Sequence, residues 1–124
     1  QKRHVYLSFY NFQFAYNFNK QSDWDLSEIA RLLTYILEQG PLVGIFTILQ
    51  VDELSSLVKM LDRNSLDRFN HRVALQMSEN DSISIIEDRT ASRIFVENKP
   101  SSKNRAFYYN KSNNIKTKFK PYSI

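Results

Sequence analysis

Residues 25–51, DLSEIARLLTYILEQGPLVGIFTILQV, place a helix pattern directly before a strand pattern, and this order decides the expected fold. Apolar residues recur through 26–37 with the 3.6-residue period of an amphipathic helix. Asp25 opens a capping-box-like spacing, and Gly40-Pro41 is expected to end the helix. Residues 43–51 then have the apolar composition of a buried strand.

A strand is also expected before this helix, at His4–Tyr10 (HVYLSFY), because β-branched and aromatic residues crowd it. Strand, helix and strand in this order indicate a βαβ unit with a right-handed crossover. Residues 72–77 (RVALQM) are predicted as a third core strand close to the other two. The predicted fold class is therefore α/β, a mostly parallel sheet with flanking helices.

The remaining segments complete this prediction. Residues 11–24 are expected to form an irregular loop, and 52–61 and 79–87 to form short helices that begin at acidic residues. Residues 90–96 fit either a short helix or an extended piece. After Pro100, residues 105–119 alternate like a β-hairpin around Asn113-Asn114.

Composition excludes several classes of protein. There is no cysteine for a disulfide or thiolate metal site, and the two histidines do not make a metal site by themselves. The two glycines, Gly40 and Gly44, fit neither a phosphate-binding loop nor a dinucleotide fingerprint. The longest apolar stretch, 42–49, is far too short to span a membrane. We therefore expect no metal site and no membrane segment in these 124 residues. We expect the 124 residues to form one domain or a fragment of a longer protein.

Positive charge is concentrated at one end of the chain. Residues 1–98 hold 10 basic and 13 acidic side chains, whereas residues 99–124 hold seven basic and no acidic ones. Aromatic residues lie between these basic ones, a pattern suited to phosphate contacts and base stacking. The alternative is an exposed hairpin whose lysines prevent pairing with other chains. The candidate DNA-binding residues are Lys103, Arg105, Lys116, Lys118 and Lys120.

Three segments together resemble the distal half of the motor domain of the FtsK/SpoIIIE family of DNA translocases, HerA/FtsK-type ATPases. They are residues 40–49 (GPLVGIFTIL), residues 70–82 (NHRVALQMSENDS), and residues 91–94 with 105–109 (ASRI, RAFYY). The second segment is the most specific of the three. The resemblance implies the C-terminal part of a RecA-like P-loop NTPase domain, ending in a hairpin.

The same resemblance implies an activity for the parent protein. A parent of this family is a cytoplasmic prokaryotic ATPase that binds ATP and Mg²⁺, forms a ring of identical subunits and moves DNA in chromosome segregation, cell division or defence. In this family a Walker B strand ends in a pair of carboxylates that support Mg²⁺ and polarise water. At the corresponding position this chain has Tyr10-Asn11. The fragment alone is therefore expected to be inactive.

Four residues are candidates for nucleotide chemistry by this resemblance. Arg72 is a candidate trans-acting arginine that stabilises charge on a neighbouring subunit's γ-phosphate. Its alternative is a structural pair with Asp67 or Asp81. Asp52, at the altered sensor position, and the pair Asp81-Ser82 are candidate cofactor-binding residues. The alternative for Asp81-Ser82 is the first turn of a helix, where a negative charge is favourable.

Two functions follow from the sequence. The first is the C-terminal fragment of an ATP-dependent DNA translocase that lacks its own phosphate-binding loop. The second is a catalytically degenerate motor lobe that serves as a structural or DNA-binding scaffold. A cut through a RecA-like sheet also predicts an unpaired edge that allows dimerisation.

Overall fold

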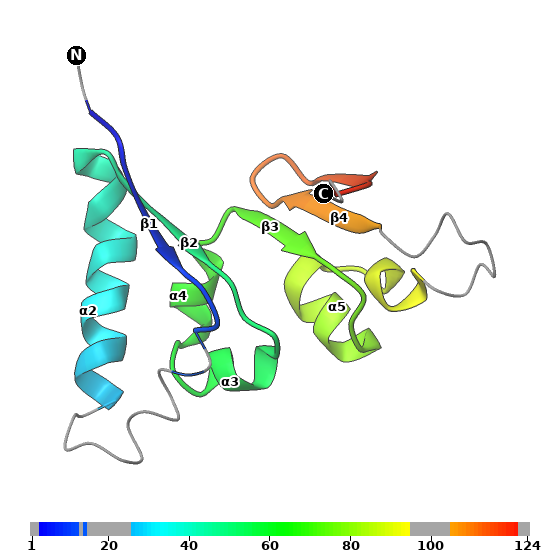
Figure 1. Ribbon diagram of the computed structural model, residues 1–124, viewed down its shortest axis with the longest axis horizontal. Coiled ribbons are helices and arrows are strands. Elements are labelled where there is room, and N and C mark those ends of the chain that lie inside the picture. Colours follow the sequence, from blue (N-terminus) through cyan, green and yellow to red (C-terminus); the bar gives the residue numbers. More distant parts are fainter. Residues whose placement is uncertain (1–2, 13, 15–25, 95–104, 122–124) are drawn as a thin grey trace. The chain divides into compact units, whose positions relative to one another are not determined.

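The computed structural model describes residues 3–12, 14, 26–94 and 105–121, and the chain divides into two compact units, residues 1–68 and 69–124 (Figure 1). Each unit has its own sheet, of two strands in the first and three in the second. The architecture is therefore α/β, with one parallel sheet and one antiparallel sheet. That residues 1–124 form a single domain or fragment stays a prediction.

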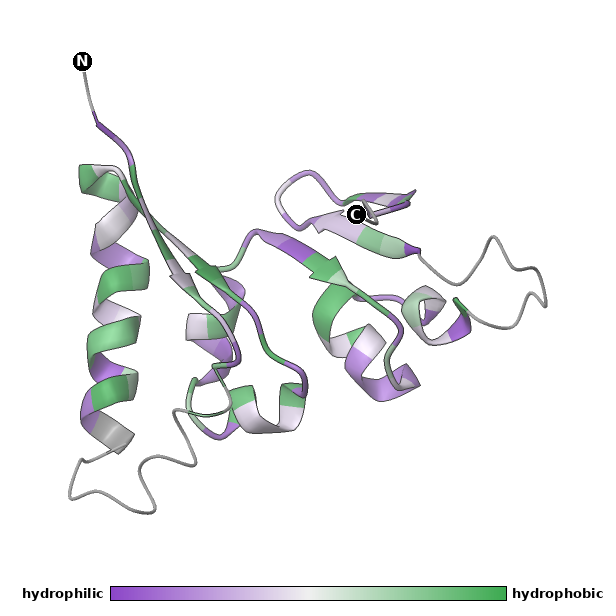
Figure 2. Cartoon of the chain, in the orientation of Figure 1, coloured by the Kyte–Doolittle hydropathy of each residue, from purple (hydrophilic) through white to green (hydrophobic). Residues whose placement is uncertain are grey.

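The first unit contains the predicted βαβ arrangement. Strand β1 (Val5–Phe9) lies parallel to β2 (Ile45–Leu49), and α2 (Leu26–Gln39) lies between them in sequence. Figure 2 shows hydrophobic residues repeating between polar ones along α2. The helix buries Leu33, which is 4% exposed, and burial of one such side chain contributes about 1.5–3 kcal/mol. The predicted helix and both strands are thus confirmed, as is their parallel pairing.

The parallel sheet is less buried than its apolar strands predict. Tyr6 and Ile48, on one face, are 61% and 52% exposed, while Leu7 and Leu49 on the other face are half-buried. On the more exposed face of this parallel sheet, the ring of Phe46 stacks on the ring of Tyr6, with ring centroids 5.7 Å apart. Continuous apolar composition predicts burial on both faces, but the described helices bury little of this one.

The turn between α2 and β2 differs in detail from the expectation. Gly40 does not end the helix in a left-handed conformation; it begins a 3-10 turn, η1 (Gly40–Val43), with Pro41 at its start. The left-handed residue is Gly44, at φ 81°. Gly40 is needed for another reason, because a Cβ there would lie 2.8 Å from the carbonyl oxygen of Ile45. The two glycines therefore bring helix and strand together.

Two short helices follow β2, where only one is predicted. They are α3 (Leu54–Val58) and α4 (Arg63–Asp67). The second begins at Asp62, whose Oδ1 accepts a 2.7 Å hydrogen bond from the amide of Ser65. Helix α4 meets α2 through a 3.0 Å hydrogen bond between the hydroxyls of Thr34 and Ser65. Leu57, Met60 and Leu61 supply the buried side chains of this part.

The second unit corrects the prediction of a mostly parallel sheet. Strand β3 (His71–Ala74) does not join β1 and β2; it pairs antiparallel with β4 (Ala106–Asn110), and β4 pairs with β5 (Ile115–Phe119). The predicted strand is also shorter, because Leu75 is 58% exposed and Ser78 already caps the next helix. The predicted hairpin is confirmed, and it is the hairpin that pairs with β3.

Helix α5 (Glu79–Ile86) and the 3-10 turn η2 (Thr90–Arg93) lie on one side of this sheet (Figure 1). The core there consists of Ala74, Ile86, Ala91, Ile94 and Tyr109, with exposures from 0% to 3%. Helix α5 ends at Glu87, which has φ 56°. We call the side of the β3–β4–β5 sheet that packs on this helix the helix face, and the other side the open face.

Candidate nucleic-acid interface

The basic hairpin is built on a tight turn that is held to the start of β3. Asn114 has φ 51°, and its amide donates to the carbonyl of Lys111 at 3.3 Å. Asn70 fixes this turn, because its carbonyl accepts from the amide of Lys111 at 2.9 Å and its Oδ1 from the amide of Ser112 at 3.1 Å. The turn and the beginning of β3 therefore form one rigid corner.

Register sorts the side chains of the sheet into its two faces. Arg72 lies opposite Tyr109, and Tyr109 opposite Lys116, so these three side chains share the helix face. Lys118 lies on that face as well, opposite Phe107. The predicted alternation of Lys116 and Lys118 on one side of a strand is therefore present, and the side is the one on which α5 packs.

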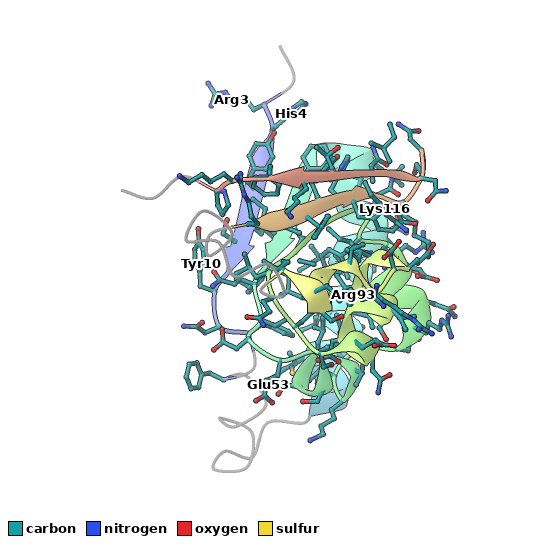
Figure 3. The ribbon with its side chains drawn as sticks, turned by 90° about the vertical axis from the view of Figure 1, so that its right-hand side faces the viewer. Arg3, His4, Tyr10, Glu53, Arg93 and Lys116 are labelled. Atoms are coloured by element: carbon teal, nitrogen blue, oxygen red, sulfur yellow. The ribbon has the colours of Figure 1, made fainter. Side chains whose placement is uncertain are left out.

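Lys116 has partners within the unit. Its Nζ lies 3.6 Å from Oδ2 of Asp88 and 5.3 Å from the centre of the Tyr109 ring. Figure 3 shows Lys116 on the hairpin, with Arg93 on the neighbouring turn. The Lys116 side chain is 28% exposed. Lys116 thus helps to close the core as well as supplying charge.

The other candidate DNA-binding residues are differently placed. Lys118 is exposed, and its Nζ lies 6.0 Å from the centre of the Phe107 ring. Lys120 is exposed just beyond β5, and Arg105 is half-buried just before β4. Lys103 falls outside the described residues. Among the described candidates, Lys118 and Lys120 are therefore the two that present the most charge to solvent.

Acidic side chains gather at the end of α5. The hydroxyl of Tyr109 donates a 2.8 Å hydrogen bond to Oε2 of Glu87, which together with burial raises the pKa of Tyr109. Asp88 accepts a 2.8 Å hydrogen bond from the amide of Thr90, and this bond, aided by the charge of Lys116, lowers the pKa of Asp88. These groups link α5 to the hairpin.

Arg72 makes structural hydrogen bonds. Its Nε donates to the carbonyl of Phe69 at 2.8 Å, and its Nη1 donates to the carbonyl of Ile85 at 3.0 Å. The guanidinium thus joins the beginning of β3 to the last turn of α5. Both carbonyls belong to the same unit, and the alternative pair of Arg72 with Asp67 or Asp81 stays a prediction. Its action on a neighbouring subunit stays a prediction.

The residues predicted to bind a cofactor lie in two separate settings. Ser82 is fully buried, donates its hydroxyl hydrogen to the carbonyl of Asp88 and accepts from the amide of Ala91 at 3.2 Å. Asp81 is half-buried in the first turn of α5, where its amide donates to the hydroxyl of Ser78 at 3.2 Å. Asp52 is exposed in the other unit. The structure therefore brings Asp81 and Ser82 into a helix start, as their structural alternative predicts.

Tyr10 and Asn11 stand at the position that the resemblance aligns with the Walker B carboxylates. Tyr10 is 72% exposed at the end of β1, and Asn11 has φ 53°. In the described part of the chain, no three His, Cys, Asp or Glu side chains gather as metal ligands would. The same residues contain no helix long and apolar enough to cross a membrane.

One pair of residues was not a candidate in the sequence. His71 and Tyr108 lie on the open face, with Nδ1 of His71 and the Tyr108 hydroxyl 2.6 Å apart and joined by a hydrogen bond. Their rings are nearly parallel, at 13°. Tyr108 is one of the aromatic residues that lie between the basic ones in sequence, but only the pairing of β3 with β4 brings it to His71, so no signal within either segment could have identified the pair.

Comparisons with known proteins add no family. No protein-family description, curated protein or solved structure matches this chain.

Proposed function

We propose that this chain is a DNA-binding scaffold that holds the phosphate backbone through its basic hairpin and does not itself hydrolyse ATP. The observation that carries the proposal is the separation of charge in the second unit. Residues 69–124 hold ten basic and five acidic side chains, and seven of the basic ones follow residue 98. Such a concentration of lysine and arginine attracts a polyanion without regard to its sequence.

Placement of the acids supports the same proposal. Among the described residues of this unit, each acidic side chain lies on α5 or directly after it; they are Glu79, Asp81, Glu87 and Asp88. The hairpin between 105 and 121 has none. A phosphate backbone that follows β5 therefore meets Lys118 and Lys120 without a carboxylate on the same strand, whereas Lys116 already lies 3.6 Å from Asp88.

The engagement of Arg72 and Ser82 also favours a scaffold over a motor. Each of these side chains already makes two hydrogen bonds within its own unit. To contact ATP or Mg²⁺, either side chain would first have to give up these bonds. Where the parent binds them, as the family resemblance implies, other segments must hold them.

A second candidate is the C-terminal fragment of an FtsK/SpoIIIE-type translocase. The observation that favours it is the parallel pairing of β1 and β2 around α2, the repeating unit of RecA-like sheets. In that case the parent would work on DNA as a ring of identical subunits. Loss of the parent's ATP turnover in Arg72→Ala, with the melting temperature unchanged, would support this candidate over the scaffold.

The scaffold is tested by fluorescence anisotropy with two unrelated DNA duplexes over a series of salt concentrations. Changing Lys116, Lys118 and Lys120 together to Gln should weaken the binding of both duplexes equally. Each lost phosphate contact lowers the slope of log K against log salt by about 0.9, so the slope should fall by up to about three.

The matched control removes three positive charges from the first unit, by Arg31→Gln, Lys59→Gln and Arg63→Gln. Net charge falls equally in the two variants, so only position differs. A slope that falls equally in both variants, or in neither, shows that the hairpin lysines do not contact phosphate. They would then serve only to keep an edge strand from pairing with other chains.

A further inference from the structure

We propose that the open face of the β3–β4–β5 sheet binds the bases of single-stranded nucleic acid by stacking them on His71 and Tyr108. This inference rests on the proposed function and deepens it, because it assigns bases to one face of the unit whose hairpin holds the backbone. The open face includes His71, Val73, Tyr108, Ile115, Thr117 and Phe119.

The face is uncovered where the two rings lie. Val73 is 58% exposed and Ile115 50% exposed, and His71 is exposed beside them. Tyr108 is half-buried at the centre of the sheet, on the middle strand. At the far end of β4, Ala106 is fully buried, so the available platform is the end that carries His71 and Tyr108.

The two rings are oriented before any ligand arrives. Their centroids lie 5.9 Å apart, their planes differ by 13°, and the hydrogen bond between Nδ1 of His71 and the Tyr108 hydroxyl holds them. Two parallel rings on adjacent strands offer neighbouring stacking positions. Stacking tolerates any base, since every base has a π face. A pre-oriented platform also reduces the entropy lost on binding.

Charge favours nucleic acid over a protein surface as the occupant. None of the side chains that the register places on the open face is acidic, and the unit's described acids are on α5 or just after it. Arg105 and Lys120 lie at the ends of the hairpin in the same small unit, and Lys111, in the turn, lies 4.0 Å from Glu87. An apolar and aromatic face in a unit of net positive charge matches a ligand that carries rings and phosphates together.

The test compares three fluorescent probes of equal length: an oligothymidylate strand, an abasic strand with the same phosphates, and a duplex. The oligothymidylate should bind at least about fivefold more tightly than the abasic strand, the lower end of what one stacked ring contributes. Tyr108→Ala should abolish that preference. Tyr108→Phe, which keeps the ring, should retain it, as should the matched control Tyr35→Ala, which removes a tyrosine that is 63% exposed on α2.

A second variant keeps the proposal testable where Tyr108→Ala does not fold. Val73→Glu places an acid on the platform at an exposed position. It should weaken the binding of the oligothymidylate more than the binding of the duplex. An oligouridylate of the same length distinguishes RNA from DNA as the source of the strand.

Three results would overturn the inference. Equal affinity for the oligothymidylate and the abasic strand removes the platform but leaves the electrostatic DNA-binding scaffold intact. Absence of binding to all probes, the duplex included, removes the proposed function as well. A dimer seen by light scattering that Val73→Glu dissociates would assign the open face to a second copy of the chain.

Discussion

Replacing Arg72 with alanine should destabilise the second unit, because its guanidinium ties β3 to the end of α5. Two hydrogen bonds are lost, at 2.8 Å to the carbonyl of Phe69 and at 3.0 Å to the carbonyl of Ile85. Bonds from a charged donor contribute about 1.5–3 kcal/mol each when fully desolvated, and these are only partly buried, so we expect a total loss of about 2 kcal/mol. For a unit of this size that lowers the melting temperature by roughly 8–16 °C.

Thermal unfolding followed by circular dichroism measures this effect. Arg72→Lys should recover little of it, because a single ammonium on a flexible stem does not match the fixed fork that reaches two carbonyls. Arg31→Ala is the control: Arg31 pairs with Glu28 at 3.3 Å on the exposed face of α2, and its loss should cost less than about 0.5 kcal/mol. The structural role is refuted when Arg72→Ala melts within about 2 °C of the control. A loss of ATP turnover in the parent would then point to the trans-acting arginine instead.

Three further predictions concern stability. Ser78→Ala removes the N-cap of α5 and should cost about 1 kcal/mol in urea unfolding, whereas Ser84→Ala, on the exposed side of the same helix, should cost nothing; equal losses would contradict the capping role. Gly44→Ala places a Cβ at φ 81° and 3.3 Å from a backbone oxygen, so it should cost about 1–2 kcal/mol, and an unchanged midpoint would show that the turn relaxes. The pKa of Asp88 lies below its ordinary value of 3.8 because the Thr90 amide donates to it, so its contribution is present above about pH 4 and is lost as the pH falls through the folded pKa. In a plot of melting temperature against pH, Asp88→Asn should reduce the fall in melting temperature at acid pH. An unchanged fall would show that other carboxylates cause it.

Elements with a local signal were predictable from the sequence. The period of α2, the apolar run of β2 and the alternation of the hairpin are each visible within a short segment, and the structure has each of them. Pairing was harder to predict, because β3 carries apolar residues that suit either a parallel or an antiparallel neighbour. Its true partner follows from the hairpin on which it docks, and that hairpin is distant in sequence.

The candidate site shows the same limit. Lys116, Lys118 and Tyr109 were visible as a basic and aromatic segment, but their face depends on register, and register directs Tyr109 and Lys116 toward α5. Arg72 was recognisable as a special position, yet two of its partners are backbone carbonyls that no residue pattern encodes. The pair of His71 and Tyr108 exists only once two strands meet.

The separation of β3 from its partner in sequence has a consequence for the order of events during synthesis. Strand β3 leaves the ribosome first, and its only partner among the described strands arrives after residues 75–105 have followed. The two strands of the hairpin are joined by a tight turn, and such hairpins form within about 1–10 μs. Closing the longer segment costs more chain entropy, so β3 should dock onto a hairpin that already exists. A nascent chain that stops before residue 119 therefore holds β3 and α5 without the strands that complete their core, and the second unit becomes protected from proteases only when its last strand emerges.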